Sequence, residues 1–375
     1  MKKGWQTKHL GDLCDVVGGG TPPKDKPAFY SGDIPWATVR DMRQDVITET
    51  EFRITKDAVK SSATNIIPAG NVVIATRVGL GKVCLIGQDT AINQDLRGIV
   101  PRSDKALVVR FLYWWLKSIA DVIVAEGTGA TVQGVKLPFV KSLQIPVPPL
   151  AEQQRIVGLL DEAFEGLATA KANAEKNLQN ARALFESHLQ SVFTQRGPGW
   201  VEKSLGETCE MYQPKTIGTK DLVPDGPYPV FGANGVIGRY DKFNHEEPQL
   251  LVTCRGATCG SVNISEPKSW ITGNAMVVRP KDHALDLHFL EFVFRGGIDI
   301  SAAITGAAQP QITRSNLSPL LIRFPKSVTE QTGLAEKFEA LTEETQRLAR
   351  HYERKHAALE ALKKSLLHQA FTGAL

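Results

Sequence analysis

Two short motifs bring together side chains that could support chemistry. Residues 18–21, Gly-Gly-Gly-Thr, could open a phosphate-binding loop, but no Gly-Lys-Ser/Thr follows them, so we expect an ordinary turn. Cys254 and Cys259 have no His-Cys partner at the spacing of a zinc site, so we expect these thiols to pack in the interior. Neither motif therefore predicts a catalytic or metal site.

The other titratable residues give no stronger signal. The eight histidines are scattered without an HExxH pattern, and both Glu246-Glu247 and Asp282-His283 look like surface turns. We predict that this chain holds no catalytic residue and no metal site. A hidden nuclease site is the less favoured alternative.

The composition describes a folded and mildly basic protein. Of the 375 residues, 42% are hydrophobic and 22% charged, which suits two or three domains with sizeable cores. The net charge is +4, and residues 1–150 carry the excess, with 19 Lys and Arg against 14 Asp and Glu. This charge permits a polyanionic partner without requiring one. Five irregularly spaced cysteines, with no apolar run typical of a membrane helix or signal peptide, predict a cytoplasmic location.

The sequence repeats itself at about half its length. Residues 4–14 and 199–209 share six of eleven identities at an offset of 195. Later matches fall at an offset of about 178, among them residues 189–194 with 367–372. Four matches in register predict two similar units in tandem, of which the first carries roughly 17 extra residues in its front half.

The front part of each unit is predicted to be a mixed domain. Apolar, β-branched runs at 71–76, 249–253 and 275–279 predict buried strands. Residues 110–116 and 288–294 follow polar turns and predict short helices. Strands mixed with occasional helices favour an α+β fold over alternating βαβ units.

Each unit is predicted to end in one long helix. The run from Ala151 contains no proline before Pro198, and Glu152 in its first turn suits the helix dipole. Apolar residues continue at 4-3-4-3 spacing through both helices, which is typical of helices packed along their length. The predicted seam includes Ile156, Leu160, Leu167, Leu334, Phe338, Leu341, Leu348, Leu359 and Leu362.

These patterns predict two mixed α/β domains separated by two long antiparallel helices that pack as a coiled coil, with a pseudo-twofold internal repeat. The expected segments are a first domain at 1–150, a central helix at 151–196, a second domain at 197–329 and a C-terminal helix at 330–375. About 45 helical residues at ~1.5 Å each would span roughly 65 Å. Two ordinary amphipathic helices in separate cores are the alternative.

Several segments together resemble a known family along essentially the whole chain. They are Gly18–Pro22, Phe29–Trp36 and Arg40–Met42; Ile145–Ile156 (Ile-Pro-Val-Pro-Pro-Leu-Ala-Glu-Gln-Gln-Arg-Ile); Tyr228–Gly235 and Arg255–Gly260; and Leu366–Gly373. Residues 148–154 (Pro-Pro-Leu-Ala-Glu-Gln-Gln) are the most specific part, and the second copy at 324–331 keeps only Pro, Glu and Gln. In these segments the sequence is similar to the specificity subunits of type I restriction-modification systems.

The resemblance implies an architecture and a function. Each target recognition domain would read one half of a split, asymmetric sequence in double-stranded DNA, and the helices would fix the spacing. Two modification subunits would dock on the helices and methylate adenine, and two restriction (motor-nuclease) subunits can join them. The chain itself would be non-catalytic and carry no cofactor, with S-adenosylmethionine, ATP and Mg on the partner subunits, and no membrane would be involved.

Base reading selects particular side chains, because Arg or Lys pairs with guanine, and Asn or Gln with adenine. Two aromatic residues, Trp36 and Tyr212, are candidates for packing on sugar or phosphate. The candidates in the first domain are Trp36, Arg40, Arg43, Arg77, Asn93, Gln94, Gln133 and Lys136. Those in the second are Tyr212, Lys215, Asn234, Arg239, Arg255, Asn274, Gln309, Gln311 and Arg314. For each of them a solvated loop residue or a backbone cap is the simpler alternative.

Three other functions compete with this hypothesis. A methyltransferase fused to a recognition domain is disfavoured, because the chain has no Asn-Pro-Pro-aromatic or Asp-Pro-Pro-aromatic motif. The chain could instead be the specificity subunit of a related system that cuts on both sides of its site. It could also be a helical adaptor that binds other proteins without DNA.

Overall fold

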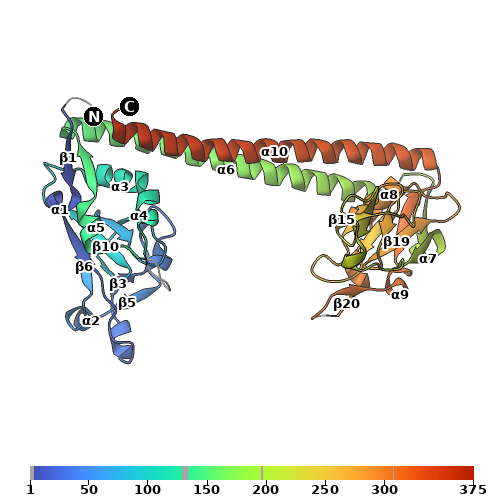
Figure 1. The fold of residues 1–375 in the computed structure, drawn as a ribbon, viewed down its shortest axis with the longest axis horizontal. Helices are drawn as coiled ribbons and strands as arrows, with labels where there is room; N and C mark the ends of the chain where they lie inside the picture. The colour runs from blue at the N-terminus through green and yellow to red at the C-terminus, as the bar shows by residue number, and fades with distance from the viewer. Residues whose placement is uncertain (1–3, 129–133, 196, 307) are drawn as a thin grey trace. The chain divides into compact units, whose positions relative to one another are not determined.

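The computed structural model describes residues 4–128, 134–195, 197–306 and 308–375 (Figure 1). The chain divides into two compact units. Unit 1 comprises Met1–Asn173 and Arg354–Leu375, and unit 2 comprises Ala174–Glu353. Both borders fall inside long helices, so the domain limits expected from the sequence stay predictions. Within the described ranges, no helix is both long enough and apolar enough to cross a membrane.

Unit 1 is built around a five-stranded sheet that is buried on both faces. Alternate residues of its strand Val72–Ala75 contribute to two different hydrophobic cores, as a period of two requires. This double burial explains the continuous apolar run and confirms the strand predicted at 71–76. The strand order is β2 (Cys14–Gly18), β10 (Leu96–Pro101), β7 (Val72–Ala75), β8 (Val83–Ile86) and β4 (Val46–Ile47).

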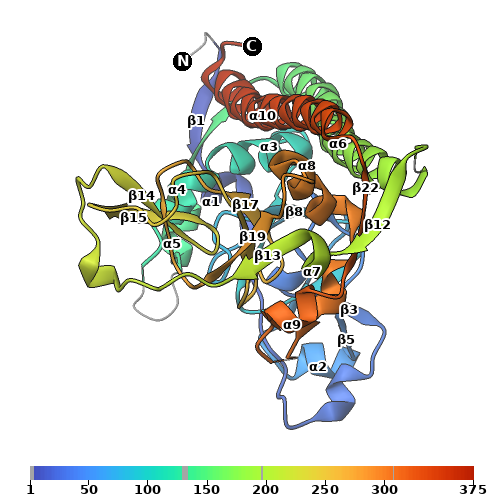
Figure 2. The same ribbon diagram turned by 90° about the vertical axis from the view of Figure 1, so that its right-hand side faces the viewer.

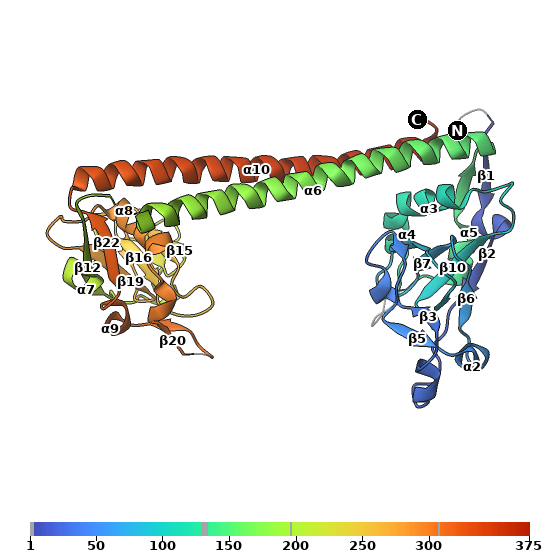
Figure 3. The ribbon, with the colours of Figure 1, turned by 180° about the vertical axis from the view of Figure 1, so that it is seen from behind.

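A second, four-stranded sheet completes the strands of unit 1. Its order is β5 (Phe52–Ile54), β3 (Ile34–Ala37), β9 (Thr90–Ile92) and β6 (Asn65–Ile67). Short helical turns adjoin it, namely η1 (Pro27–Tyr30), η2 (Val39–Asp41) and α2 (Lys56–Lys60). In Figures 1 and 3, β3, β5 and α2 lie on the side of unit 1 away from the long helix α6 (Leu150–Gln195). This side is therefore open to a ligand that does not contact the helix.

Helices cover the other side of the five-stranded sheet. The helix α3 (Val109–Ser118) lies between the strands and the long helices (Figure 1), and its buried residues share one core with Ile156 and Leu160 of α6. The short helices are α1 (Leu10–Leu13), α4 (Ala120–Ala125) and α5 (Leu137–Ser142). The chain start is held beside the entry of α6, because β1 (Gln6–His9) pairs with β11 (Gln144–Val147).

Unit 2 repeats this plan and confirms the predicted internal repeat. Its main sheet has the order β13 (Cys209–Tyr212), β19 (Ala275–Pro280), β16 (Leu250–Thr253) and β17 (Val262–Ile264). Strand β12 (Trp200–Ser204) pairs with β22 (Leu321–Pro325), as β1 pairs with β11 (Figure 2). The helix α8 (Leu287–Phe292), continued by a π turn at Val293–Gly297, corresponds to α3. The strands predicted at 249–253 and 275–279 and both short helices are confirmed.

The smaller elements of unit 2 differ from those of unit 1. They are the sheet β15 (Gly235–Tyr240), β14 (Tyr228–Gly232) and β18 (Trp270–Ile271), the pair β20 (Ile304–Thr305) and β21 (Gln311–Ile312), and the turns α7 (Leu205–Thr208), η3 (Thr219–Asp221), η5 (Ile300–Ala303) and α9 (Arg314–Leu317). The offset between equivalent strands falls from 195 at β2 and β13 to 178 at β7 and β16. The extra residues of unit 1 therefore lie between β2 and β7, where its four-stranded sheet is built.

The helix α6 packs antiparallel to the second long helix, α10 (Val328–Thr372). In unit 1, Arg155 donates to the carbonyl oxygen of Leu375 at 2.9 Å, and Lys171 Nζ lies 3.3 Å from Glu360 Oε1. Residue numbers thus rise along α6 as they fall along α10. This order within the unit confirms the predicted antiparallel pairing.

The predicted helix seam differs in burial along its length. Ile156, Leu160 and Phe338 are each 1% exposed, whereas Leu341 and Leu362 are 39% and 47% exposed. The remaining predicted members are half-buried, namely Leu167, Leu334, Leu348 and Leu359. The seam is therefore closed where each long helix meets a domain core and more open at Leu341 and Leu362, and the assignment of these residues to helix pairing or to a partner stays a prediction.

One buried glutamine fastens each long helix to its own domain. Gln153 is fully buried; its Oε1 accepts from the Val108 N–H at 2.8 Å, and its Nε2 donates to the carbonyl oxygens of Ala106 and Pro148 at 3.1 and 2.9 Å. The amide therefore ties the first turn of α6 to the segment before α3 and to the end of β11. It also satisfies three backbone groups, of which the carbonyl oxygen of Pro148 is buried and the other two are part-buried.

The second copy of this glutamine makes the same three bonds. Gln331, also fully buried, accepts from the Asp286 N–H at 2.8 Å and donates to the carbonyl oxygens of Ala284 and Pro325 at 3.1 and 2.8 Å. We call these two residues the glutamine clamps. They explain why Gln is kept in a segment that otherwise shares only Pro and Glu between the copies.

A charged pair beside each clamp differs between the units. In unit 1, Arg110 of α3 forms a two-pronged pair with Asp161 of α6, and Trp114 Nε1 donates to the same carboxylate at 2.7 Å. At the equivalent place in unit 2, His288 Nδ1 lies 2.8 Å from Glu339 Oε1. Both units thus have a polar contact between the short helix (α3 or α8) and the long helix (α6 or α10), but the side chains are Arg and Asp in unit 1 and His and Glu in unit 2.

We predict that Gln153→Ala destabilises unit 1 by about 2–4 kcal/mol, because it leaves buried backbone groups of the clamp without partners. The measurement is urea unfolding followed by hydrogen exchange of the unit 1 sheet amides. The exposed neighbour gives the matched control, and Gln154→Ala should change stability by less than about 0.5 kcal/mol. Equal effects of the two variants would show that the clamp carries no special stabilisation.

Candidate nucleic-acid interface

Equivalent arginines follow the central strand of each main sheet. Arg77 comes two residues after β7 and Arg255 two residues after β16, and both side chains are exposed. The strands hold the same place in their sheets, so the repeat presents a guanidinium from the same point of each unit. Each arginine lies beside a cavity lined by other predicted readers.

In unit 2, four predicted residues line one cavity of about 220 Å³, namely Tyr212, Arg255, Gln311 and Arg314. They come from β13, the end of β16, β21 and α9. The backbones of Arg255 and Gln311 form a β-bridge, and Thr313 caps α9 by accepting from the Asn316 N–H. We call this the arginine cavity; it gathers two guanidinium groups, an amide and a phenol within one concave surface.

The phenol of the arginine cavity belongs to a hydrogen-bonded chain. Tyr212 Oη lies 2.8 Å from His245 Nε2, and His245 Nδ1 lies 2.7 Å from Asn244 Oδ1. Because the amide oxygen can only accept, His245 carries its proton on Nδ1 and Nε2 accepts from Tyr212. Arg279 lies over the Tyr212 ring, 5.5 Å from its centroid. This chain fixes the orientation of Tyr212 at the cavity wall.

In unit 1, predicted and unpredicted residues line a larger cavity of about 560 Å³. We call it the aromatic cavity; its lining residues are Lys24, Tyr30, Trp36, Thr38, Val39, Arg40, Phe52, Val78, Asn93 and Asp95. Arg77 lies beside it, with Nη1 3.6 Å from Asp95 Oδ1. Lys24, Tyr30 and Phe52 are not among the residues predicted to read bases. Tyr30 lies in the aromatic Tyr-Ser-Gly-Asp-Ile-Pro-Trp segment, which was the available sequence signal for this site.

The glycine-rich run packs against Asn93 and Trp36, two residues that line the aromatic cavity. A side chain at Gly19 would place its Cβ 2.0 Å from the carbonyl oxygen of Asn93, so the backbones touch directly. The carbonyl oxygen of Gly20 accepts from Trp36 Nε1 at 3.2 Å and from Thr64 Oγ1 at 2.8 Å. The run is an extended, packed segment rather than the turn expected from the sequence.

Several predicted readers have other roles in the structure. Trp36 is 7% exposed with its Nε1 bonded inside, so it offers no open face to sugar or phosphate. Asn93 is 6% exposed, and both polar atoms of its side chain bond to Asp95. Arg239 donates to the carbonyl oxygens of Gly226 and Pro227 at 2.5 and 2.6 Å. These three side chains are structural, because neighbouring groups use their hydrogen-bonding atoms.

The remaining predicted readers do not gather at either cavity. Asn234 bonds to Thr253 and Thr258, Gln94 accepts from Thr21, and Lys136 precedes the first residue of α5. Four others are exposed without a shared site, namely Lys215, Asn274, Gln309 and Arg43, the last of which donates to the carbonyl oxygen of Arg40. Gln133 lies outside the described residues.

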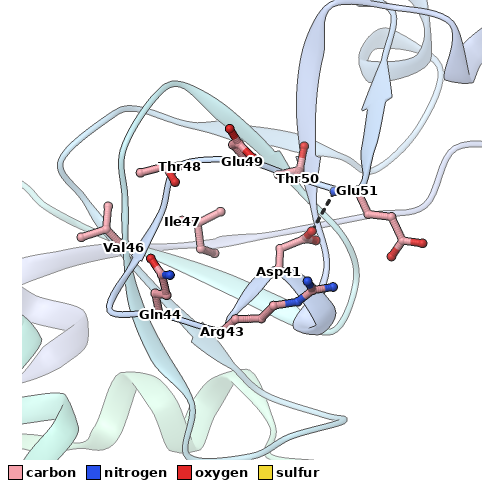
Figure 4. A pocket seen from close by; sticks show the side chains of 9 residues that line it. All are labelled: Asp41, Arg43, Gln44, Val46, Ile47, Thr48, Glu49, Thr50 and Glu51. Carbon is pink, nitrogen blue, oxygen red and sulfur yellow. Dashed lines mark hydrogen bonds between the residues drawn. The ribbon is translucent and has the colours of Figure 1, made fainter. Parts of the chain in front are cut away.

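A second cavity of unit 1 has the opposite charge. It has a volume of about 410 Å³ and is lined by nine residues between Asp41 and Glu51, among which are the acids Asp41, Glu49 and Glu51 and the single arginine Arg43 (Figure 4). Asp41 Oδ1 accepts from the Glu51 N–H at 2.8 Å and Asp41 Oδ2 from the Thr38 N–H at 2.7 Å, which closes the loop. We call it the acidic cavity. A polyanion would be repelled here, so it is not a candidate DNA contact.

The cysteines are packed rather than grouped. Cys14 and Cys209 occupy equivalent buried positions, and burial raises the pKa of each thiol, to about 12 and about 11. Cys254 is 1% exposed, which confirms its predicted packing, whereas Cys259 is half-buried. In the described part of the chain, no three His, Cys, Asp or Glu side chains gather as a metal-binding group.

The family of the chain follows from comparison with known proteins. A profile described as "Type I restriction modification DNA specificity domain" matches residues 2–178 and again residues 198–353. The chain belongs to this family. The two matches correspond to the two repeats, so the predicted family and the predicted double-domain fold are both confirmed.

Curated relatives of this chain are named as specificity subunits. The EcoR124I/EcoR124II subunit of Escherichia coli is 36% identical over 42% of this chain and 40% of its own length. The MjaIX subunit of Methanocaldococcus jannaschii is 30% identical over 50% and 44%. The chain thus spans less than half the length of these two, whereas the EcoprrI subunit of Escherichia coli is 25% identical over 89% and 87%.

Solved structures support the fold of the chain. One solved chain comes from work on complex assembly and conformational transition of the type I R-M system. It superposes with a TM-score of 0.82 at 20% identity, and the match covers 100% of this chain and 99% of that one. The HsdS subunit of Thermoanaerobacter tengcongensis gives 0.64 at 20% identity, covering 100% and 98%. At such identities the likeness concerns the fold alone.

We predict that the Tyr212 chain makes unit 2 less stable in mild acid. Burial first, and then the nearby Arg279 charge, lower the pKa of His245 below its ordinary 6.5. The unfolded chain therefore takes up a proton that the folded chain resists, and stability falls as the pH drops below 6.5. Hydrogen exchange of the β13 and β19 amides against pH measures this effect.

His245→Gln keeps an acceptor for Tyr212 but does not titrate, so it should flatten this pH dependence. His351, exposed on α10, gives the matched control, and His351→Gln should leave it unchanged. An unaltered slope in His245→Gln would show that the acid sensitivity has another origin.

Proposed function

We propose that each domain of this specificity subunit reads one half of a bipartite, asymmetric DNA sequence. The observation that carries the proposal is the repeated arginine at the end of β7 and β16, each beside a cavity with further polar or cationic side chains. A protein that reads two different half-sites needs an equivalent DNA-contacting residue in each domain. The side chains around that residue must differ between the domains, because the two half-sites differ. The arginine cavity and the aromatic cavity meet both requirements.

The side chains of the arginine cavity suit recognition in the major groove. Arg255 and Arg314 can each offer two parallel N–H donors to guanine, and Gln311 can offer a donor and an acceptor to adenine. Tyr212 Oη donates to His245, so it faces the cavity as an acceptor. In unit 1, Arg40 and Arg77 take the corresponding role.

The partners follow from the family, and we propose them for this chain on physical grounds. Two modification subunits would dock on the long helices, where Leu159, Leu341 and Leu362 are 39–47% exposed. Restriction subunits would join that complex. S-adenosylmethionine, ATP and Mg would be bound by these partners, while this chain would be non-catalytic, without a cofactor and located in the cytoplasm.

The small net charge of +4 supports a shared grip on DNA. Phosphate contacts by Lys and Arg dominate the affinity of proteins that bind DNA alone. A subunit with modest charge can supply base reading while its partners neutralise much of the backbone. Tight binding of the free chain to nonspecific DNA at physiological salt would contradict this division of labour.

We predict that Arg255→Ala relaxes base preference at one position of one half-site. Loss of a bidentate contact costs ~1–3 kcal/mol of discrimination, and the other half-site should be unchanged. The measurement is sequencing of methylated sites after the chain, with its modification subunits, acts on a random DNA library.

Two controls accompany this experiment. Arg347→Ala removes the same charge from the exposed face of α10 and should leave both half-sites intact. The chain without modification subunits should leave the DNA unmethylated. A complex without any sequence preference, or methylation by this chain alone, would contradict the proposed function.

We predict that the long helices set the gap between half-sites. Seven residues inserted into α6 within 165–185, matched by seven in the facing part of α10, add ~10 Å of helix. At 3.4 Å per base pair the gap should grow by about three base pairs, with both half-sites unchanged. Seven residues inserted at the exposed turn around His283 serve as the control. Altered half-sites with an unchanged gap would refute the role of the helices.

A further inference from the structure

We propose that the aromatic cavity of unit 1 binds one unstacked nucleotide. The proposal rests on the DNA-reading function above and adds a ligand to it. The observation behind it is that this cavity is large enough to hold a small ligand. Its volume of about 560 Å³ lies in the range of small-ligand sites, roughly 300–1,000 Å³, and exceeds the 220 Å³ of the arginine cavity.

The wall of the cavity can stack a base. Phe52 is 39% exposed and Val78 is 54% exposed, and both line this cavity, so its wall offers apolar surface to a ligand. Trp36 supports Phe52 edge-on, with ring centroids 6.3 Å apart, and Tyr30 supports Trp36 at 5.9 Å. Phe52 is therefore held in place by a packed aromatic row, so a base can stack on it without first ordering it.

The polar groups of the cavity match the rest of a nucleotide. Lys24 and Arg40 line it and supply cations for a phosphate. Asp95 offers a carboxylate to the amino or imino groups of a base, and its position is fixed by Asn93 Nδ2 at 3.1 Å and by Arg77 at 3.6 Å. One apolar wall, one acceptor and a cationic rim are the chemistry of a nucleoside monophosphate unit.

The acidic cavity of unit 1 lacks the side chains that suit the aromatic cavity to a nucleotide. It is nearly as large, at about 410 Å³, but its lining has no aromatic ring and its acids outnumber its single arginine. It therefore offers neither a stacking surface nor a favourable site for phosphate. Size alone does not distinguish the two cavities of unit 1, whereas the side chains do.

The nucleotide can come from two sources, a free monophosphate or a residue of the bound DNA. Taking a nucleotide out of a duplex costs free energy, and the cost is smallest where the base is already unpaired. A duplex with one unpaired nucleotide therefore offers the ligand at the least cost. Free nucleoside monophosphates test the other source.

The experiment measures binding of the full chain, without partners, by fluorescence anisotropy. Two labelled duplexes of the same sequence are compared, one fully paired and one with a single unpaired nucleotide, and dAMP, dCMP, dGMP and dTMP are titrated as competitors. The unpaired nucleotide should tighten binding about 5- to 150-fold, the equivalent of ~1–3 kcal/mol for one stacked base.

Variants place the effect at the aromatic cavity. Phe52→Ala should abolish the preference, and Phe52→Tyr, which keeps a ring, should retain it. Phe243 gives the matched control: it is 37% exposed and packs edge-on against Tyr228 in unit 2, so Phe243→Ala should keep the preference. Thermal unfolding checks that each variant is folded.

The outcomes separate the possibilities. A preference for the unpaired nucleotide that depends on Phe52 supports a nucleotide taken from DNA, and Phe52-dependent binding of a monophosphate alone supports a free nucleotide. Equal affinity for both duplexes without monophosphate binding overturns the proposal, as does a preference that survives Phe52→Ala. The sequence preference of the complex, measured in the library experiment, would persist if only this proposal failed and would be absent if the proposed function failed.

Discussion

Attachment of each long helix to its domain by one buried amide is the constraint on which the rest of the structure depends. Gln153 and Gln331 occupy equivalent positions in the two units, and each makes three hydrogen bonds to equivalent backbone groups. Each long helix therefore starts at a fixed position relative to its own α+β domain. A neutral amide suits this task because it donates and accepts at once and carries no charge to desolvate. Loop changes elsewhere in a domain leave this attachment intact.

The shared core of the two units accommodates different surface elements. Both units keep the main sheet, the short helix and the clamp, while the elements between β2 and β7 and between β13 and β16 differ in length and pairing. In unit 1 the variable elements β3, β5 and α2 lie on the side away from α6 (Figures 1 and 3), and Trp36 and Phe52 from these strands line the aromatic cavity. Stability and recognition are thus carried by different segments of one domain.

The sequence predicted the repeat, the buried strands and the long helices, because periodicity and apolar runs are local signals. It also placed Arg77 and Arg255 correctly as equivalent residues. It could not show that Trp36 and Asn93 are buried or that Arg239 bonds to backbone carbonyl oxygens, because only tertiary contacts decide whether a polar atom is already bonded. Nor could helical periodicity show how far Leu341 and Leu362 are exposed, because exposure depends on what packs against each turn.

The two units differ in how their short helix meets the long one. Arg110 and Trp114 make three hydrogen bonds to the Asp161 carboxylate, whereas His288 meets Glu339 through Nδ1. A carboxylate held by several donors resists rotation as well as displacement, because each bond acts in a different direction. A contact through one ring nitrogen limits the separation of the two side chains but not their relative angle, so the two joints differ in torsional stiffness.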